Sequence, residues 1–129
     1  MKVSLDTIRG WLDAKILSRP DKLGTEVDTV MACDLMSDLL AHSKPGALLV
    51  TGLANIQMVR AVLASDMCGA VLVRGKLPED RVLMMAEENG IPLMATRTSL
   101  FEACGQLYAK GLRGVPPGEH FVHVVRTPT

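Results

Sequence analysis

The sequence predicts an α/β domain with three layers, in which helices cover both faces of a mainly parallel sheet of at least four strands. Apolar segments alternate four times with segments of helical periodicity from residue 27 onward. The apolar segments are continuous runs, which is typical of parallel strands buried on both faces. The length of 129 residues, with 48% apolar residues, suits one domain with one continuous core.

The N-terminal region predicts one helix and one short strand. Residues 4–13 fit a helix that begins at Ser4 as its N-cap, because the apolar residues then share one face. Residues 15–18 follow as a brief strand, and residues 19–24 form a turn-rich loop.

The central region predicts four strand–helix units. The strands are residues 27–33, 47–51, 70–73 and 91–95. The helices are residues 35–42, 56–65, 79–88 and 99–110. We expect N-caps at Asp34, Asn55 and Ser99, with Ser99 and Glu102 as a capping box, and an end to the third helix at Asn89-Gly90. On the second helix, Ile56, Val59, Val62 and Leu63 are expected to face inward.

The domain is predicted to span residues 1–114, and residues 115–129 form a C-terminal tail. Two prolines make residues 115–118 typical of a linker. Residues 120–125 then fit either an edge strand or a flexible end.

Composition narrows the classes of partner. Fourteen basic and fourteen acidic residues cancel, and aromatic residues are few and scattered, so we expect no nucleic-acid partner. The N-terminus lacks an apolar signal segment, and no apolar run approaches the roughly 20 residues that span a bilayer. We therefore expect a cytoplasmic protein without a membrane partner.

The titratable residues give no sign of a metal or cofactor site. Cys33, Cys68 and Cys104 have no zinc-like or disulfide-like spacing, so we expect buried free thiols. His120 and His123 would point to opposite faces of a strand, so we expect no joint metal site there. Motifs for nucleotide hydrolysis, dinucleotide binding and a serine nucleophile are missing, so the sequence predicts no catalytic residue, no metal and no cofactor.

Polar and basic residues follow the predicted strands where each strand ends. They are Asp34, Thr51, Gly52, Asn55, Arg74, Gly75, Lys76, Thr96 and Arg97. The carboxyl ends of parallel strands meet at one edge of a sheet, and helix N-termini there favour an anion. These nine residues are thus candidates for binding a nucleotide or another anion. The alternative is that the same residues are ordinary caps, turns and solvated charges.

One predicted helix is apolar through more than a full turn, at residues 82–86. A helix that is apolar all round is buried on more than one side, and in so small a chain the second side fits an interface. Met84 and Met85 are therefore candidate contacts in a homodimer. A methionine-rich core is the alternative.

Five segments together resemble DRTGG-domain proteins. They are residues 33–38, 49–55, 71–78, 90–96 and 101–105, which include LVTGLAN and VLVRGKLP. The resemblance covers roughly residues 1–114. The Asp-Arg-Thr segment of the family would fall at about residues 53–55, where this chain lacks the acid and the base.

The DRTGG family is similar in fold to the N-terminal domain of HPr kinase/phosphorylase. It also occurs within some phosphotransacetylases and beside CBS domains, and some stand-alone members look associated with hydrogenase-like or NADH-dehydrogenase-like gene clusters. The resemblance implies a non-catalytic regulatory module that self-associates and docks on a larger enzyme, of a redox or hydrogenase-related kind. The alternative is a domain that senses a nucleotide or another anion at the strand ends.

Overall fold

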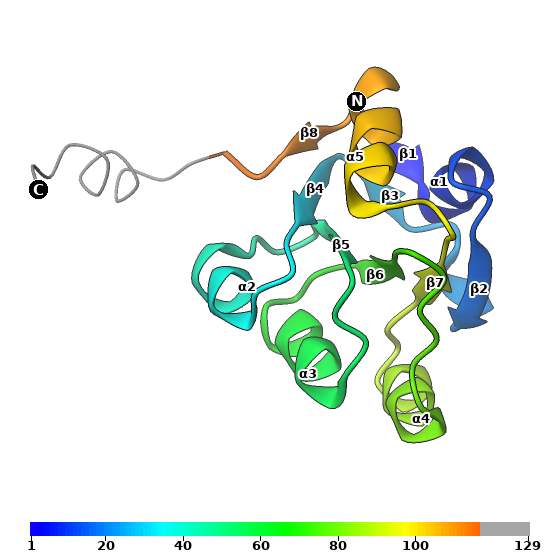
Figure 1. Ribbon diagram of the computed structural model, residues 1–129, viewed down its shortest axis with the longest axis vertical. Helices are drawn as coiled ribbons and strands as arrows, with labels where there is room; N and C mark the ends of the chain where they lie inside the picture. The colour runs from blue at the N-terminus through cyan, green and yellow to red at the C-terminus, as the bar shows by residue number, and fades with distance from the viewer. Residues whose placement is uncertain (117–129) are drawn as a thin grey trace, which may run out of the picture.

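The computed structural model describes residues 1–116 and confirms the three-layer α/β fold (Figure 1). Its main sheet has six strands in the order β2-β7-β6-β5-β4-β8. The strands are β2 (Lys15–Ser18), β4 (Thr29–Ala32), β5 (Leu48–Thr51), β6 (Gly69–Leu72), β7 (Leu93–Ala95) and β8 (Arg113–Gly114). All neighbours pair in parallel except β2, which runs antiparallel to β7 at one edge.

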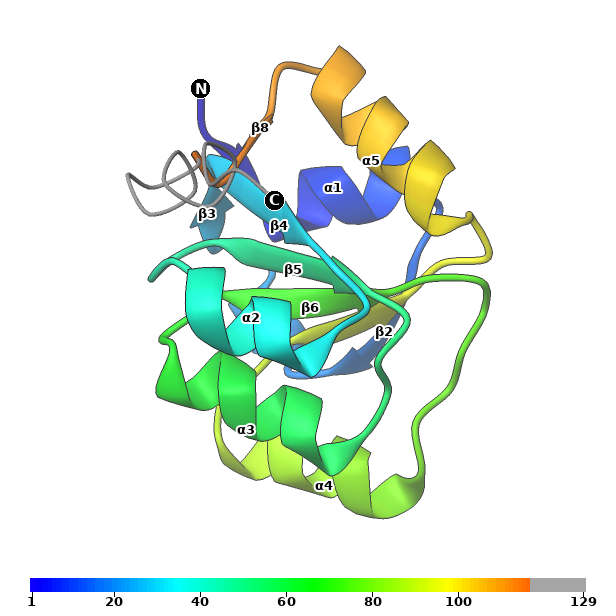
Figure 2. The ribbon, with the colours of Figure 1, turned by 60° about the vertical axis from the view of Figure 1, so that its left-hand side comes forward.

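Five helices cover the two faces of this sheet. They are α1 (Leu5–Trp11), α2 (Met36–His42), α3 (Ile56–Ala64), α4 (Asp80–Glu88) and α5 (Leu100–Ala109). Figure 2 shows α2, α3 and α4 on one face and α1 and α5 on the other. A short 3-10 turn, η1 (Pro20–Lys22), follows β2.

The buried strands divide their side chains between two hydrophobic clusters. In β5, Leu49 packs with α2, α3 and α4, while Leu48 and Val50 pack with α1 and α5. This alternation is the pleat of a strand covered on both faces, where every residue is apolar but successive residues serve different layers. The continuous apolar runs of the sequence follow from this double coverage.

The predicted strand over residues 27–33 is wrong as one element. β3 (Glu26–Val27) pairs antiparallel with β1 (Val3–Ser4) in a separate two-stranded sheet, and β4 begins only at Thr29. β8, which the sequence did not predict, lies parallel to β4 on its outer side. The predicted strand over 120–125 lies outside the described residues.

Two further local predictions are corrected. Leu63 is 47% exposed and faces away from the core, and Met58 takes the inward position instead. The three thiols are unpaired but only half-buried. Even so, burial raises the pKa of each thiol, and that of Cys68 to about 12.

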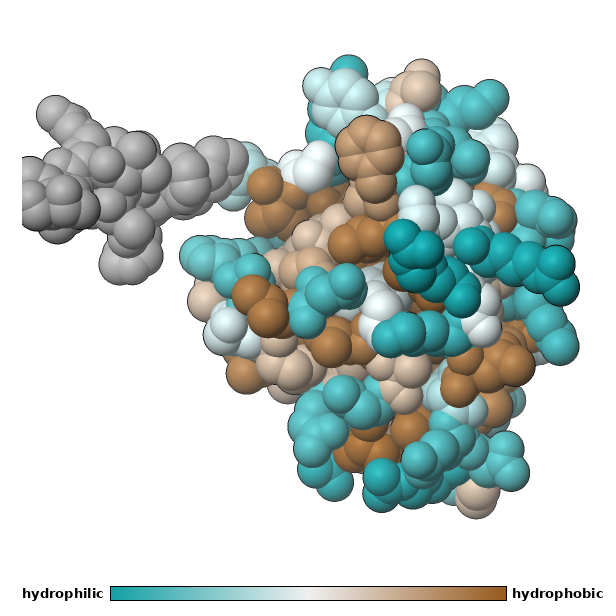
Figure 3. All heavy atoms as spheres, in the orientation of Figure 1, coloured by the Kyte–Doolittle hydropathy of each residue, from teal (hydrophilic) through white to brown (hydrophobic). Residues whose placement is uncertain are grey.

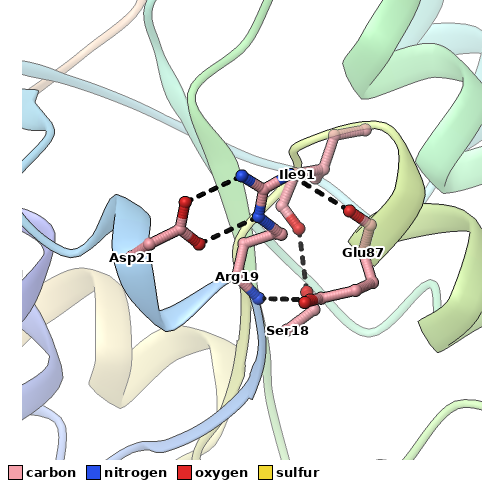
Figure 4. A network of polar contacts seen from close by, with 5 residues as sticks. All are labelled: Ser18, Arg19, Asp21, Glu87 and Ile91. Carbon is pink, nitrogen blue, oxygen red and sulfur yellow. Dashed lines mark hydrogen bonds and ion pairs between the residues drawn. The ribbon is translucent and has the colours of Figure 1, made fainter.

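A bulge interrupts the pairing of β2 with β7: the register of the two strands shifts between Ile16 and Ser18. The buried Ser18 hydroxyl fills the gap: it donates to the Ile91 carbonyl at 2.8 Å and accepts from the Leu93 N–H at 2.9 Å. Figure 4 shows Ser18 beside the polar turn that follows β2. The side chain thus replaces backbone bonds that the bulge removes.

Candidate functional site

The carboxyl ends of four parallel strands meet at one edge of the sheet, as the sequence predicted. β4, β5, β6 and β7 are neighbours in that order, and each runs parallel to the next. The nine predicted site residues therefore lie along one edge. Eight of them divide into two groups with different roles, and the ninth, Asn55, is a helix cap.

The first group is a structural tie between the ends of β4 and β5. Asp34 Oδ1 accepts hydrogen bonds from the Gly52 N–H at 2.6 Å and from the Thr51 hydroxyl at 3.3 Å. A Cβ at Gly52 would lie 3.3 Å from that same oxygen, so the close approach favours glycine. Asp34 does not cap α2, because its carboxylate is used by the neighbouring loop, and the N-cap is Leu35 without a side-chain bond.

Asn55 is a helix cap. Its Oδ1 accepts from the Met58 N–H at 2.9 Å at the start of α3, as predicted. The Asp34 carboxylate has no donor for an anion, and the Asn55 Oδ1 is already engaged by the start of α3. The negative charge of Asp34 would oppose an anion at this end of the edge.

The second group surrounds a hollow of about 410 Å³ at the ends of β6 and β7. Of the predicted residues, Gly75, Thr96 and Arg97 line it. The other lining residues are Leu12, Asp13, Lys15, Leu77, Ala95 and Thr98. The hollow is the one part of the edge where predicted ligand residues share a concave surface within residues 1–116.

Backbone hydrogen bonds fix the loops around this hollow. The Arg74 N–H donates to the Thr98 carbonyl at 3.0 Å, and the Gly75 N–H donates to the Thr96 carbonyl at 2.7 Å. Arg74 and Gly75 both have positive φ, of 58° and 67°, which turns the chain sharply after β6. The buried Thr96 hydroxyl donates to the Leu12 carbonyl at 2.7 Å, so it holds the loop after α1 rather than a ligand.

Positive charge gathers around the hollow. Lys15 and Arg97 line it, and Arg74 and Lys76 extend from the loop after β6, with all four residues exposed. Within residues 1–116 none of these four cations forms an ion pair, and Asp13 is the single acid in the lining. This arrangement attracts an anion, although exposure to solvent weakens each contact.

Sequence reasoning missed Asp13, Lys15 and Thr98. Lys15 reaches the hollow because β2 pairs antiparallel with β7, so that Lys15 lies opposite Ala95. The sequence pattern predicts a strand at residues 15–18, but it holds no signal for the strand with which it pairs. In the part of the chain that the structure describes, no group of three or more His, Cys, Asp or Glu side chains is placed to hold a metal ion.

The candidate interface residues Met84 and Met85 differ in exposure. The Met84 side chain is 61% exposed, while Met85 is half-buried and packs against the core. Met84 also lines a groove of about 530 Å³ between α4 and β2, together with Ile16, Leu17, Ser18, Pro20, Leu83 and Glu87. α4 is thus apolar toward the sheet and partly apolar along this groove.

The helices within residues 1–116 include none with the length and apolar character of a membrane-spanning segment.

Comparison with known proteins agrees with this architecture. The sequence model of the DRTGG domain matches residues 7–108. The fold is similar to a crystal structure of the CBS and DRTGG domains of the regulatory region of Clostridium perfringens pyrophosphatase, complexed with its activator diadenosine tetraphosphate. The TM-score is 0.68 at 17% identity, and the match covers 81% of this chain and 45% of that one. A sequence comparison with curated proteins finds no match.

Proposed function

The chain belongs to the DRTGG domain family, and on that premise we propose that it is a non-catalytic regulatory module that self-associates and docks on a larger enzyme. The observation that carries this proposal is exposed apolar surface on opposite faces of the sheet. On one side Met84 lines the groove between α4 and β2, and on the other Phe101 and Tyr108 stand out from α5. If two copies of the chain associate through one of these surfaces, the other surface stays exposed and can bind an enzyme.

The fold similarity supports a regulatory role, since the C. perfringens domain belongs to the regulatory region of a pyrophosphatase. This chain spans less than half the length of that matched structure. The enzyme partner of this chain is therefore part of the proposal. A redox or hydrogenase-related enzyme is the class that we propose as the partner. The sequence predicted Met84 and Met85 as contacts in a homodimer; that prediction is untested, and we propose the groove at Met84 for the enzyme instead.

Sedimentation at micromolar concentration tests self-association. We expect a dimer, and a single species near the chain mass of 13.9 kDa would contradict it. Docking is tested by cross-linking and mass spectrometry of complexes captured from the native host. Cross-links between an enzyme and residues near Met84 support docking at the groove if they are lost in a Met84→Glu variant. An enzyme that the wild type and the Met84→Glu variant retain equally contradicts docking there.

A second candidate function is the sensing of an anion, for which we propose a nucleotide. The observation that favours it is the hollow lined by Lys15 and Arg97, with Arg74 and Lys76 beside it and no ion pair to these cations within residues 1–116. The activator in the C. perfringens structure is a dinucleoside polyphosphate, which supports this class of ligand. Arginine binds a phosphate with two parallel hydrogen bonds, and lysine adds a point charge.

Calorimetric titration with adenine and guanine nucleotides tests the second function. Arg97→Ala should weaken binding by about 1.5–3 kcal/mol, the usual contribution of a hydrogen bond to a charged group. Arg60→Ala is the matched control, because Arg60 is exposed on α3, away from the hollow. Absence of binding at millimolar nucleotide would remove the sensing function and leave the docking module intact.

A further inference from the structure

The outer face of α5 carries a stripe of aromatic and small residues, of which the two aromatic residues are exposed within residues 1–116. Phe101, Cys104, Gly105 and Tyr108 follow the spacing i, i+3, i+4, i+7, which places them on one side of a helix. Phe101 is 82% exposed and Tyr108 is 61% exposed. The opposite side of α5 is buried in the core through Ala103 and Leu107, so the helix has two apolar sides.

A small apolar hollow lies beside this stripe, between α5 and the strands β4 and β8, of which β8 is the edge strand. It has a volume of about 180 Å³ and is lined by Val30, Ala32, Cys104, Leu107, Tyr108, Leu112, Arg113 and Gly114. An apolar cavity of about 150 Å³ can hold a benzene ring, so this hollow fits one aromatic side chain. In Figure 3, apolar side chains gather in the region where Figure 1 draws α5 and β4.

The centre of the stripe permits close approach of a second helix. Gly105 is exposed, and a Cβ built there meets no atom within 4 Å. A glycine inside a helix lowers its stability by roughly 1 kcal/mol relative to alanine. No contact within residues 1–116 accounts for glycine at this position, whereas a helix packed across it would.

The charges at the two ends of the stripe are opposite. Glu102 lies in the first turn of α5, next to Phe101, and no ion pair engages it within residues 1–116. At the other end the Arg113 guanidinium lies 4.0 Å from the centre of the Tyr108 ring. An antiparallel copy of the same helix would place each acid near the other copy's base. The stripe is therefore complementary to itself under two-fold symmetry.

We propose that two copies of this chain pack their α5 helices antiparallel about a two-fold axis near Gly105. The Phe101 ring of each copy then enters the other copy's hollow beside Tyr108, and Glu102 lies near the other copy's Arg113. Exposed aromatic anchors that fill a pocket contribute most to the affinity of an interface. This inference rests on the proposed self-association and assigns it to a surface other than the groove at Met84.

Sedimentation equilibrium on the full chain and three variants tests the inference. Gly105→Gln keeps the monomer intact, since its side chain enters open space, but it separates the two helices. Phe101→Glu removes the anchor from an exposed position. Each should weaken the dimer on the order of 30-fold or more, the usual loss at an interface hot spot. Met84→Glu is the matched control on the opposite face and should leave the dimer unchanged.

The outcomes separate this inference from the proposed function. A wild-type chain that stays monomeric at about 100 µM overturns both this inference and the proposed self-association. That concentration is on the order of the dissociation constant of a weak dimer. A wild-type dimer that survives Gly105→Gln and Phe101→Glu overturns the α5 interface and leaves self-association standing. Loss of the dimer in all three variants overturns the assignment to α5. If circular dichroism shows that Phe101→Glu unfolds, Gly105→Gln alone decides.

Thiol cross-linking provides an independent readout of the geometry. Cys104 lies beside Gly105, so the Cys104 thiols of two copies would face each other across the axis. A short bifunctional maleimide should link them into a covalent dimer. The link should be lost in Cys104→Ser and kept in Cys33→Ser. A covalent dimer that persists in Cys104→Ser would contradict the proposed axis.

Discussion

Arg19 and Glu87 join the turn after β2 to the end of α4 through two hydrogen bonds. The Arg19 backbone N–H donates to the Glu87 carboxylate at 2.7 Å, and the Arg19 guanidinium donates to the Glu87 carbonyl at 3.1 Å (Figure 4). Arg19 has a positive φ of 49°, which is uncommon for a residue other than glycine. The contacts with Glu87 hold this conformation between elements 68 residues apart in sequence.

Glu87→Ala removes the acceptor of the Arg19 backbone N–H. We expect a loss of about 0.5–1.5 kcal/mol in the free energy of unfolding, because the contact is exposed but includes a charged acceptor. Urea denaturation measures it. The matched control is Glu88→Ala, next along the helix and also exposed. An equal effect of both changes would show that α4 responds to lost charge and not to the Arg19 contact.

Asp21 should titrate well below the usual range of a carboxyl group. A hydrogen-bonded ion pair with the Arg19 guanidinium, at 2.7 Å, lowers the pKa of Asp21 to about 2. Its stabilising effect is present above the unfolded pKa of about 3.9 and is lost as pH falls toward the folded value. Carboxyl-carbon NMR follows this titration. In Arg19→Ala the pKa of Asp21 should return toward the ordinary value, and an unchanged titration would contradict the pairing.

Ser18→Ala should destabilise the edge of the sheet. The change leaves the Leu93 N–H and the Ile91 carbonyl without their buried partner, which costs about 1–3 kcal/mol. Thermal denaturation measures the loss. Ser37→Ala is the control, because Ser37 is exposed on α2. We expect that change to lie within about 0.5 kcal/mol of the wild type. A Ser18→Ala protein as stable as the control would mean that the bulge relaxes without the hydroxyl.

Gly69→Ala should be among the most destabilising single changes at a glycine. Gly69 has a φ of +153°, and a Cβ there would lie 2.6 Å from the Pro92 carbonyl oxygen. Such backbone strain alone costs about 1–3 kcal/mol, and the clash at the start of β6 adds to it. Gly24→Ala is the control, because a Cβ at Gly24 meets nothing within 4 Å. Comparable stabilities of the two variants, measured by urea denaturation, would contradict the close approach.

The core of the fold could be predicted because its signals are local. Continuous apolar runs identified β5 and β6, and Asn55 and Ser99 cap α3 and α5 as expected. The Ser99 hydroxyl accepts from the Glu102 N–H at 3.2 Å, which is half of the predicted capping box. Cap residues act within one turn of their own helix, so the sequence nearby suffices to find them.

The failures involve partners that are distant in sequence. Asp34 precedes a helix and fits a cap, but the Gly52 N–H, 18 residues away, takes its carboxylate. The hollow with Lys15 depends on β2 pairing with β7, and the Ser18–Leu93 bond of that pair spans 75 residues. The stripe on α5 was missed because Phe101 and Tyr108 have the spacing of core residues. Exposure, and not spacing, distinguishes an interface from a core.

Cys68 should be the least reactive thiol at alkaline pH. Burial is the largest cause that raises the pKa of Cys68 to about 12, against about 8.5 for a free cysteine. At pH 9 the folded chain then holds on the order of 1,000-fold less Cys68 thiolate than the unfolded chain, and alkylation should slow accordingly. Because the unfolded state loses this proton first, the contribution of Cys68 to stability falls as pH rises from about 9 toward 12.

Iodoacetamide labelling followed by peptide mass spectrometry, with and without denaturant, measures the protection at Cys33, Cys68 and Cys104 separately. Cys68→Ser serves as the control for the assignment of the slow site. Labelling of Cys68 in the folded chain at the rate found in denaturant would contradict its burial.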